Sequence, residues 1–234
     1  MTTYIMSFDY LQQTIGVTFK DQNLLKSAFY HRSYLNEDRT IKKSNERLEF
    51  LGDAVLSLLT SHFLYETYPE NPEGTLTNIR SSLVKTKSLC DVSRELGLGD
   101  LLFLSKGEEE DLGRKNPSLL ADTFEALLGA IFLDQGLEVA KKFLEAHLFV
   151  RVTEIIKNKS YIDFKSSLQE IIQDQTRISP IYRVTKSEGP DHAKTFWVDV
   201  VAGTKNVLGS GVGKSKQEAE SDAAKNALEK MGKP

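Results

Sequence analysis

The sequence contains a single cysteine, Cys90, so no disulfide can form within the chain. An isolated cysteine is more often a small buried apolar residue than a nucleophile, and a chain without disulfides fits a reducing compartment, so we expect a cytoplasmic protein. No apolar run approaches the roughly 20 residues that a membrane span needs. The opening stretch, MTTYIMSFDYLQQTIG, also lacks a basic segment followed by a long apolar core, so neither a signal peptide nor a membrane partner is predicted.

Histidine is also scarce, and the four histidines are too scattered to give the cysteine and histidine spacing of a zinc site. The stretch GSGVGKS superficially resembles a phosphate-binding loop, but three residues separate Gly209 from Gly213 where that loop has four. The net charge is -3, with the acidic excess in residues 1–160, while residues 161–234 are slightly basic. Any basic patch for an acidic partner must therefore be local.

Residues 1–156 are predicted to form a domain made almost entirely of helices. Apolar residues at helical spacing predict long helices at 45–68, 76–99, 118–135 and 137–156. Pro117 suits the first turn of the third of these helices, and Gly136 suits its end. The intervening stretch SKGEEEDLGRKNP is predicted to be a loop, and we expect its acidic run, Glu108 to Asp111, either to be solvated or to repel an acidic partner and shape its entry.

The helical pattern of apolar residues ends at residues 157–160, which are polar, lack periodicity and suit a linker. Residues 161–231 are predicted to form a second domain in the order α-β-β-β-α. The strands are expected in IYRVTKSEG, AKTFWVDVVAG and KNVLGSGVG, which alternate with period two. The last helix begins with a capping box, Ser215 followed by Glu218. The fold class is therefore an all-α domain followed by a small α+β domain with helices on one face of an antiparallel sheet.

Two strongly apolar helices carry acids on one side. In NERLEFLGDAVLSLL, Glu49 and Asp53 share a face, and Glu46 lies one turn earlier; in LADTFEALLGAIFLD, Asp122 and Glu125 share a face. Such acids can form a solvated polar stripe. Alternatively, packing of the two helices gathers them into a self-repelling cluster with raised pKa values, which a hard divalent cation such as Mg²⁺ relieves. The apolar character of both helices and the lack of lysine or arginine on these faces favour the metal site.

The acidic blocks, with HRSYLNE and LTNIRSSLV in the expected order, resemble the ribonuclease III family. In residues 161–231 the blocks LQEIIQ, EGPDHAKTF and GKSKQEAESDAAKNAL resemble a double-stranded-RNA-binding domain. The resemblance covers nearly the whole chain, and its motifs are long. The order of the two domains is that of the short bacterial form of the family.

The resemblance implies a role for each matching residue. The Mg²⁺ ligands, for which Mn²⁺ is an expected substitute, would be Glu49, Asp53, Asp122 and Glu125, with Asp53 and Glu125 as the catalytic pair. Two further acids, Glu46 and Glu73, would be accessory. The aromatic side chain of Phe50 would enter a socket on a partner subunit, which implies a homodimer.

The resemblance also implies three RNA contacts, because duplex RNA is read by shape across its minor groove. The first helix would offer polar groups to 2′-hydroxyls, from Ser166, Gln169 and Glu170. The loop GPDHA would offer His192 to the next minor groove. The last helix would offer phosphate ligands at its start, from Lys214, Ser215 and Lys216. This last contact has independent support, since a helix N-terminus favours anions and two lysines add to it.

The implied function is a Mg²⁺-dependent, homodimeric endoribonuclease specific for double-stranded RNA. Its cuts would be staggered and leave 5′-phosphate and 3′-hydroxyl ends, in substrates such as ribosomal precursor RNA and structured messenger RNA. Two alternatives stay open. One is a catalytically silent double-stranded-RNA-binding protein, which the intact acids disfavour. The other is a purely structural helical dimer, which leaves the motifs of residues 161–231 unexplained.

Overall fold

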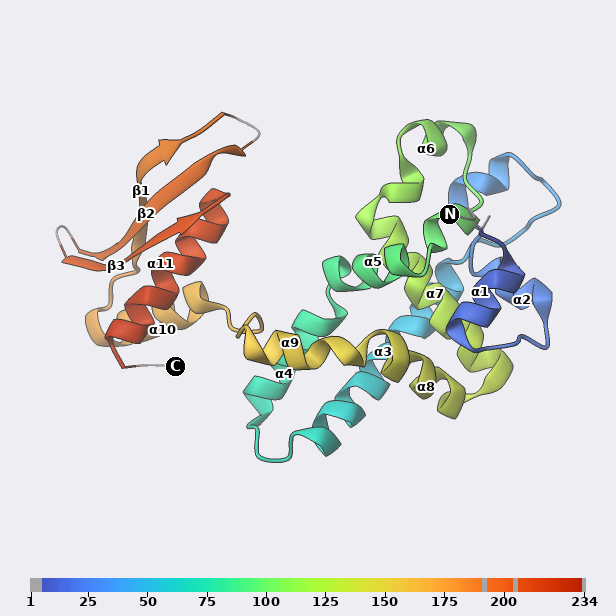
Figure 1. Cartoon of the computed structure of the whole chain (residues 1–234), viewed down its shortest axis with the longest axis horizontal. Coiled ribbons are helices and arrows are strands. Elements are labelled where there is room, and N and C mark those ends of the chain that lie inside the picture. The colour runs from blue at the N-terminus through green and yellow to red at the C-terminus, as the bar shows by residue number, and fades with distance from the viewer. Residues whose placement is uncertain (1–5, 191–192, 204–205, 233–234) are drawn as a thin grey trace, which may run out of the picture. The chain divides into compact units, whose positions relative to one another are not determined.

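The computed structural model describes residues 6–190, 193–203 and 206–232. Contacts divide the chain into two compact units, residues 1–161 and 162–234, which run from blue to yellow and from orange to red in Figure 1. No described helix is both long and apolar enough to cross a membrane. The limits given above for the two domains and their linker stay a prediction.

The described part of the first unit is helical, with one isolated bridge between Tyr30 and Phe103. Its elements, with η for a short 3₁₀ helix, are α1 Phe8–Ile15, α2 Gln22–Ser27, η1 Arg32–Asn36, α3 Glu46–Thr67, α4 Glu73–Val84, α5 Thr86–Glu95, η2 Leu98–Leu101, α6 Lys106–Glu110, η3 Gly113–Lys115, α7 Pro117–Gln135, α8 Leu137–His147, η4 Phe149–Arg151 and α9 Val152–Lys157. This composition confirms the all-helical class predicted for residues 1–156.

Helix α7 is the central element of the first unit. The side chain of Asn116 caps its start by accepting the N–H of Ser118 at 2.9 Å, and Pro117 occupies the first turn. Gly136 ends the helix with a φ of 84°. Apolar residues surround most of its circumference, so α7 lies inside the unit, where both α3 and α5 pack against it.

The single helix predicted for residues 76–99 is wrong. Helix α4 ends at Val84 and α5 begins at Thr86, because Lys85 has an extended backbone with a ψ of 151°. The break contains neither proline nor glycine. It redirects the chain so that Leu89 and Val92 of α5 join the core beside α7. Packing of these residues, rather than a local breaker, explains the two helices.

Two other segments also differ from the sequence-based prediction. Residues 137–156 form α8, η4 and the start of α9 instead of one helix, and α8 ends before Leu148. The stretch predicted as a loop contains α6 and η3. Ser105 caps α6 by accepting the N–H of Glu108, and Arg114 donates from Nη1 to the carbonyl oxygens of Gly99 and Leu102 at 3.0 and 2.9 Å. These local bonds order a polar segment that lacks helical periodicity.

The second unit has the predicted order α-β-β-β-α. Its elements are α10 Phe164–Thr176, β1 Ile181–Glu188, β2 Thr195–Ala202, β3 Asn206–Gly213 and α11 Lys216–Lys230. The antiparallel sheet has the order β1-β2-β3, and both helices pack with it around one core (Figure 1). On the outer face, Lys186 of β1 pairs with Trp197 of β2 and places its ammonium 4.9 Å from the indole centroid.

Small residues allow α11 to lie very close to β3. A Cβ placed on Gly211 would lie 2.1 Å from the backbone nitrogen of Ala223, and one on Gly209 would lie 2.6 Å from the backbone nitrogen of Ala227. Both alanines are fully buried. The glycines of β3 and the alanines of α11 therefore form one packing surface, which fixes where α11 begins relative to the sheet.

Candidate metal centre and nucleic-acid interface

The nuclease-like site starts from a contact between the backbones of α3 and α7. A Cβ placed on Gly52 would lie 1.8 Å from the carbonyl oxygen of Glu125, and one on Gly129 would lie 2.3 Å from the carbonyl oxygen of Leu48. Such distances leave no room for a side chain, so the two helices meet as closely as glycine permits. Because Glu49 lies one turn before Gly52, this contact brings the acids of the two helices together.

Three carboxylates converge at this crossing. Glu49 of α3 and Asp122 and Glu125 of α7 each offer an oxygen, and these oxygens lie within 4.8 Å of one another. All three side chains are half-buried. A cavity of about 350 Å³ opens beside them and is lined by Glu49 and Asp122. The structure therefore brings together three of the four predicted metal ligands, from helices about seventy residues apart in sequence.

Asp53, the fourth predicted ligand, is exposed and lies outside this group of oxygens. It stands one turn after Glu49, about 6 Å further along α3. Its charge is nevertheless the largest of the neighbouring charges that raise the pKa of Glu125. Asp53 therefore faces the same cluster from the solvent side, although its oxygens do not enter the tight group.

Burial and mutual repulsion control the protonation of the cluster. Burial, followed by the charges of Asp53, Asp122 and Glu49, raises the pKa of Glu125 to about 8. Burial and the neighbouring acids also raise the pKa of Glu49. Burial raises the pKa of Asp122, while His31 acts in the opposite direction. In the metal-free protein, Glu125 is thus the carboxylate of this group that retains its proton near neutral pH.

The donor set fits a hard divalent cation. Each ligand atom of the cluster is a carboxylate oxygen, and the charged groups that act on Glu125 are all acids. Among the described residues, the charges that act on Glu125 therefore add to the repulsion, and none of them offsets it. A cation that prefers oxygen ligands supplies positive charge and removes the repulsion between Glu49, Asp122 and Glu125.

The two predicted accessory acids lie in different places. Glu46 is the first residue of α3, accepts the hydroxyl of Ser44 at 2.6 Å and lines the cavity beside the cluster. Its carboxylate also lies 4.0 Å from the guanidinium of Arg32. Glu73 begins α4, accepts the hydroxyl of Thr77 at 3.1 Å and lines a separate groove. Within one chain, Glu46 is therefore next to the acidic cluster and Glu73 is not part of it.

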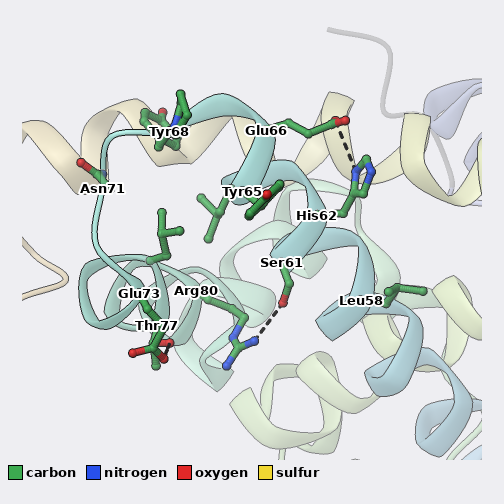
Figure 2. Close-up of a pocket in the computed structure, with 13 residues that line it drawn as sticks. Leu58, Ser61, His62, Tyr65, Glu66, Tyr68, Asn71, Glu73, Thr77 and Arg80 are labelled. Atoms are coloured by element: carbon green, nitrogen blue, oxygen red, sulfur yellow. Dashed lines mark hydrogen bonds and ion pairs between the residues drawn. The ribbon is translucent and has the colours of Figure 1, made fainter.

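That groove, of about 980 Å³, lies between the end of α3 and α4 (Figure 2). Leu58, Tyr65 and Leu76 contribute apolar surface, and Arg80 donates to the hydroxyl of Ser61 at 2.8 Å at its wall. Phe50 lies earlier on α3 and is 80% exposed. A helix that buries one side against α7 thus presents a large aromatic side chain and an apolar groove on its other side.

In the second unit, the predicted RNA ligands occupy two helix starts. Ser166, Gln169 and Glu170 are exposed on α10. At α11, the hydroxyl of Ser215 accepts the N–H of Glu218 at 3.1 Å, and the Glu218 carboxylate accepts the N–H of Lys214 at 2.8 Å. Lys214 and Lys216 are both exposed beside this capped N-terminus. The predicted ligand His192 lies outside the described residues.

His31 is a residue of the site to which sequence reasoning gave no role. It precedes η1 and lines the 350 Å³ cavity together with Glu49 and Asp122. The motif HRSYLNE contributes to the family resemblance, and nothing in its spacing indicates that the imidazole lines a cavity beside α3 and α7. Contacts between distant segments place His31 at the cavity: the backbone N–H of Asn45 donates to the carbonyl oxygen of Tyr30, and the backbone N–H of His31 donates to that of Phe103.

Comparison with known proteins identifies the two units. A family model described as Ribonuclease-III-like matches residues 21–152, and a model of the double-stranded RNA binding motif matches residues 164–231. Ribonuclease 3 of Streptococcus gordonii is 47% identical over 216 residues, which are 92% of each chain. Ribonuclease 3 of Enterococcus faecalis is 46% identical over 222 residues, 94% of this chain and 96% of that one. The chain belongs to the ribonuclease III family.

The predicted family and fold class are thereby confirmed: this ribonuclease III chain is an endoribonuclease of its family, with a helical nuclease domain followed by a double-stranded-RNA-binding domain. Its nuclease domain resembles that of ribonuclease III from Campylobacter jejuni, with a TM-score of 0.55 and 39% identity over 63% of this chain and 96% of that one. That structure is described as showing flexibility in a region involved in dimer formation of the nuclease domain.

The α3–α7 contact predicts that Gly52→Ala weakens cation binding. The added methyl group cannot fit beside the carbonyl oxygen of Glu125, so the helices must separate and the oxygens of Glu49 and Glu125 move apart. We expect Mn²⁺ affinity, measured by electron paramagnetic resonance, to fall about tenfold or more, the order seen when ligand orientation is lost. Gly74→Ala is the matched control, because a Cβ at Gly74 meets nothing within 4 Å. Equal affinities in the two variants would contradict this account.

The pKa of Glu125 predicts the pH dependence of stability without metal. Between its ordinary pKa of 4.5 and its folded value of about 8, the folded state holds a proton that the unfolded state releases. Stability from this group is therefore complete below about pH 4.5 and is lost as the pH rises toward 8. We expect thermal unfolding in EDTA to show this decline in the parent and in Glu145→Gln on the exposed side of α8, but much less in Glu125→Gln. A decline unchanged in Glu125→Gln would show that another group titrates.

Proposed function

We propose that this chain is a Mg²⁺-dependent endoribonuclease that hydrolyses phosphodiester bonds of double-stranded RNA, with Mn²⁺ as a working substitute. The observation that carries the proposal is the convergence of Glu49, Asp122 and Glu125 from two packed helices into a cluster in which the described charges that act on Glu125 are all acids. Oxygen ligands on rigid helices suit Mg²⁺ better than a softer metal. The match to the Ribonuclease-III-like family supports the same assignment.

The chemistry follows from what phosphodiester hydrolysis requires. An activated water must attack in line with the leaving oxygen, and the transition state gains negative charge. A bound divalent cation would lower the pKa of that water and offset the added charge. Glu49, Asp122 and Glu125 would hold the cation, and their helices keep the carboxylates from moving apart. We infer 5′-phosphate and 3′-hydroxyl products.

Asp53 and Glu125 are the proposed catalytic pair. Glu125 is the most strongly perturbed acid of the cluster, and Asp53 acts on it from the exposed side, where water and RNA can approach. We assign Asp53 to the metal site together with the three converging acids. Glu46 lines the adjoining cavity and is proposed as an accessory acid of the same site. Glu73 is proposed as an accessory acid that acts only in a dimer, since its groove is separate.

The second unit is proposed to bind the duplex by its shape. Exposed Ser166, Gln169 and Glu170 suit ribose 2′-hydroxyls in a minor groove. Lys214 and Lys216 flank the N-terminus of a helix of 15 residues, where the backbone N–H groups already favour phosphate. The Ser215 hydroxyl caps this helix, so it holds the turn that carries the lysines. His192 remains a proposed ligand from the loop between β1 and β2.

A homodimer is proposed through α3. The same helix carries Phe50, exposed by 80%, and an apolar wall of the groove formed by Leu58 and Tyr65, exposed by 58% and 75%. Two copies related by a two-fold axis present the same surface to each other. The projecting side chain of each copy then lies opposite the groove of the other copy. The groove is large enough for one aromatic side chain, so Phe50 of each protomer would enter the groove of the other. Each active site would then cut one strand, which staggers the cuts.

The cellular location, the substrates and the domain limits of the enzyme are also proposed. The single, buried Cys90 supports a cytoplasmic enzyme, because a reducing compartment keeps such a thiol free. Duplex stems of ribosomal precursor RNA and of structured messenger RNA are the proposed substrates. Residues 157–160 are proposed to link a nuclease domain of residues 1–156 to an RNA-binding domain of residues 161–231.

Removal of one carboxylate charge predicts loss of cleavage with retained binding. On a long RNA duplex with Mg²⁺, we expect the parent to cut both strands and Glu125→Gln to be slower by roughly 100-fold or more, the order found when one preorganised group is lost. Duplex binding in Ca²⁺ should be unchanged, and Glu145→Gln should cut normally.

Two other results would count against this assignment. A parent that shifts the duplex on a gel without cutting it would support the catalytically silent RNA-binding protein. Equal cutting by the parent and Glu125→Gln would remove Glu125 from the mechanism.

The groove on α3 predicts that Phe50→Ala weakens self-association. Each dimer would bury two copies of this side chain, and burial of one is worth about 1.5–3 kcal/mol, so we expect a dissociation constant at least about tenfold higher. Sedimentation equilibrium measures it. Leu133→Ala is the control, because Leu133 is 55% exposed on α7, outside the groove. Dissociation caused by Leu133→Ala and not by Phe50→Ala would place the interface elsewhere.

A further inference from the structure

A chain of hydrogen bonds fixes the imidazole of His31. The backbone N–H of Ser105 donates to the hydroxyl oxygen of Ser33 at 3.0 Å, and this oxygen lies 2.8 Å from Nδ1 of His31. The backbone N–H of Ser33 also points at Nδ1, at 3.4 Å. The ring is therefore held on its Nδ1 edge by groups from η1 and from the segment before α6.

These contacts determine which ring nitrogen carries the proton. A backbone N–H can only donate, so the Nδ1 of His31 that faces Ser33 must be the unprotonated nitrogen. The Ser33 oxygen receives the N–H of Ser105, which leaves its own hydrogen for Nδ1. Burial lowers the pKa of His31 and favours the neutral ring. The single ring proton is then on Nε2, which belongs to the opposite edge of the imidazole.

The cavity next to the acids is where this proton can be used. His31 lines it together with Glu49, Asp122, Asn45 and Thr123. The amide of Asn45 donates to the carbonyl oxygen of Ala28 at 3.2 Å, and the hydroxyl of Thr123 donates to that of Leu119 at 2.6 Å. These two side chains therefore direct their donors into the protein. Arg32 also lines the cavity, but its guanidinium lies 4.0 Å from the carboxylate of Glu46, another lining residue. The Nε2–H of His31 remains as a donor for Glu49 and Asp122.

We propose that His31 is a positioning residue of the nuclease site. Its Nε2–H holds one oxygen of the Asp122 carboxylate through one water in the cavity that both residues line, and so determines which oxygen faces the cation. Partners of this kind orient metal ligands in many sites, and their loss typically costs about 10–100-fold in affinity or activity. The inference rests on the proposed metal-dependent function and adds a residue to it.

Two substitutions separate the two edges of the imidazole. Glutamine places an amide N–H near the position of Nε2, whereas asparagine places its amide near Nδ1 and suits the helix-capping position that His31 occupies. We expect His31→Gln to keep Mn²⁺ affinity within about threefold of the parent and His31→Asn to lose about tenfold, as second-shell losses do. His147→Gln, at a histidine of α8 that lines neither the cavity nor the groove, controls for the loss of an imidazole.

The outcomes are distinguishable. Equal Mn²⁺ affinity in the two variants overturns the proposal, because neither edge of the imidazole would then affect the metal site. A higher Mn²⁺ affinity in His31→Asn also overturns it, because the Nδ1 edge would then be the one that affects the site. With Mg²⁺ and duplex RNA, we expect kcat to fall more in His31→Asn than in His31→Gln, while KM stays similar in both variants. A parent protein that binds Mn²⁺ but leaves the duplex intact would overturn the proposed function, while the Mn²⁺ measurement would still decide the role of His31.

Nitrogen-15 NMR of the parent protein gives a test that needs no variant. We expect the His31 ring to be in the neutral form with its proton on Nε2, and the Nε2 resonance to shift when Mg²⁺ is added. A proton on Nδ1, or an Nε2 resonance that Mg²⁺ leaves unchanged, overturns the proposal even if both substitutions prevent folding.

Discussion

Two helices can approach until their backbones touch only where neither carries a side chain, and α3 and α7 do so at Gly52 and Gly129. Every property of the acidic cluster depends on this contact. It sets the distance between Glu49 and the acids of α7, whose oxygens therefore converge. The apolar residues around α7 then hold the contact rigidly, because their burial would be lost if the helices separated.

Holding these carboxylates close together costs electrostatic free energy, and in the absence of metal the protonation of one carboxylate lowers that cost. Glu125, with a pKa of about 8, keeps a proton where an ordinary glutamate has lost it. Cation binding must therefore release that proton, so affinity for the metal rises with pH. The cavity beside the acids and the groove proposed for a partner are lined by different parts of α3, so one helix would serve both catalysis and assembly.

Sequence alone predicts the parts of the fold that local rules control. The apolar spacing of α3 and α7, the proline and glycine that bound α7, and the capping box at Ser215 all have the structure expected of them. The break at Lys85 could not be predicted, because it follows from how α5 packs on α7 and no breaker residue marks it. The position of His31 was missed for a similar reason, since the bonds that place it come from Ser105, far along the chain. The acids were found because their residue type conflicts with their apolar surroundings.

Trp197 is the sole tryptophan of the chain, and it lies on β2 with its ring beside Lys186. The indole emission of the intact protein therefore comes only from the RNA-binding unit, whereas the helical signal in circular dichroism comes mainly from the nuclease unit. The two halves of the molecule carry separate spectroscopic reporters without any label. Melting of one half can be followed while the other remains folded, in the full-length protein.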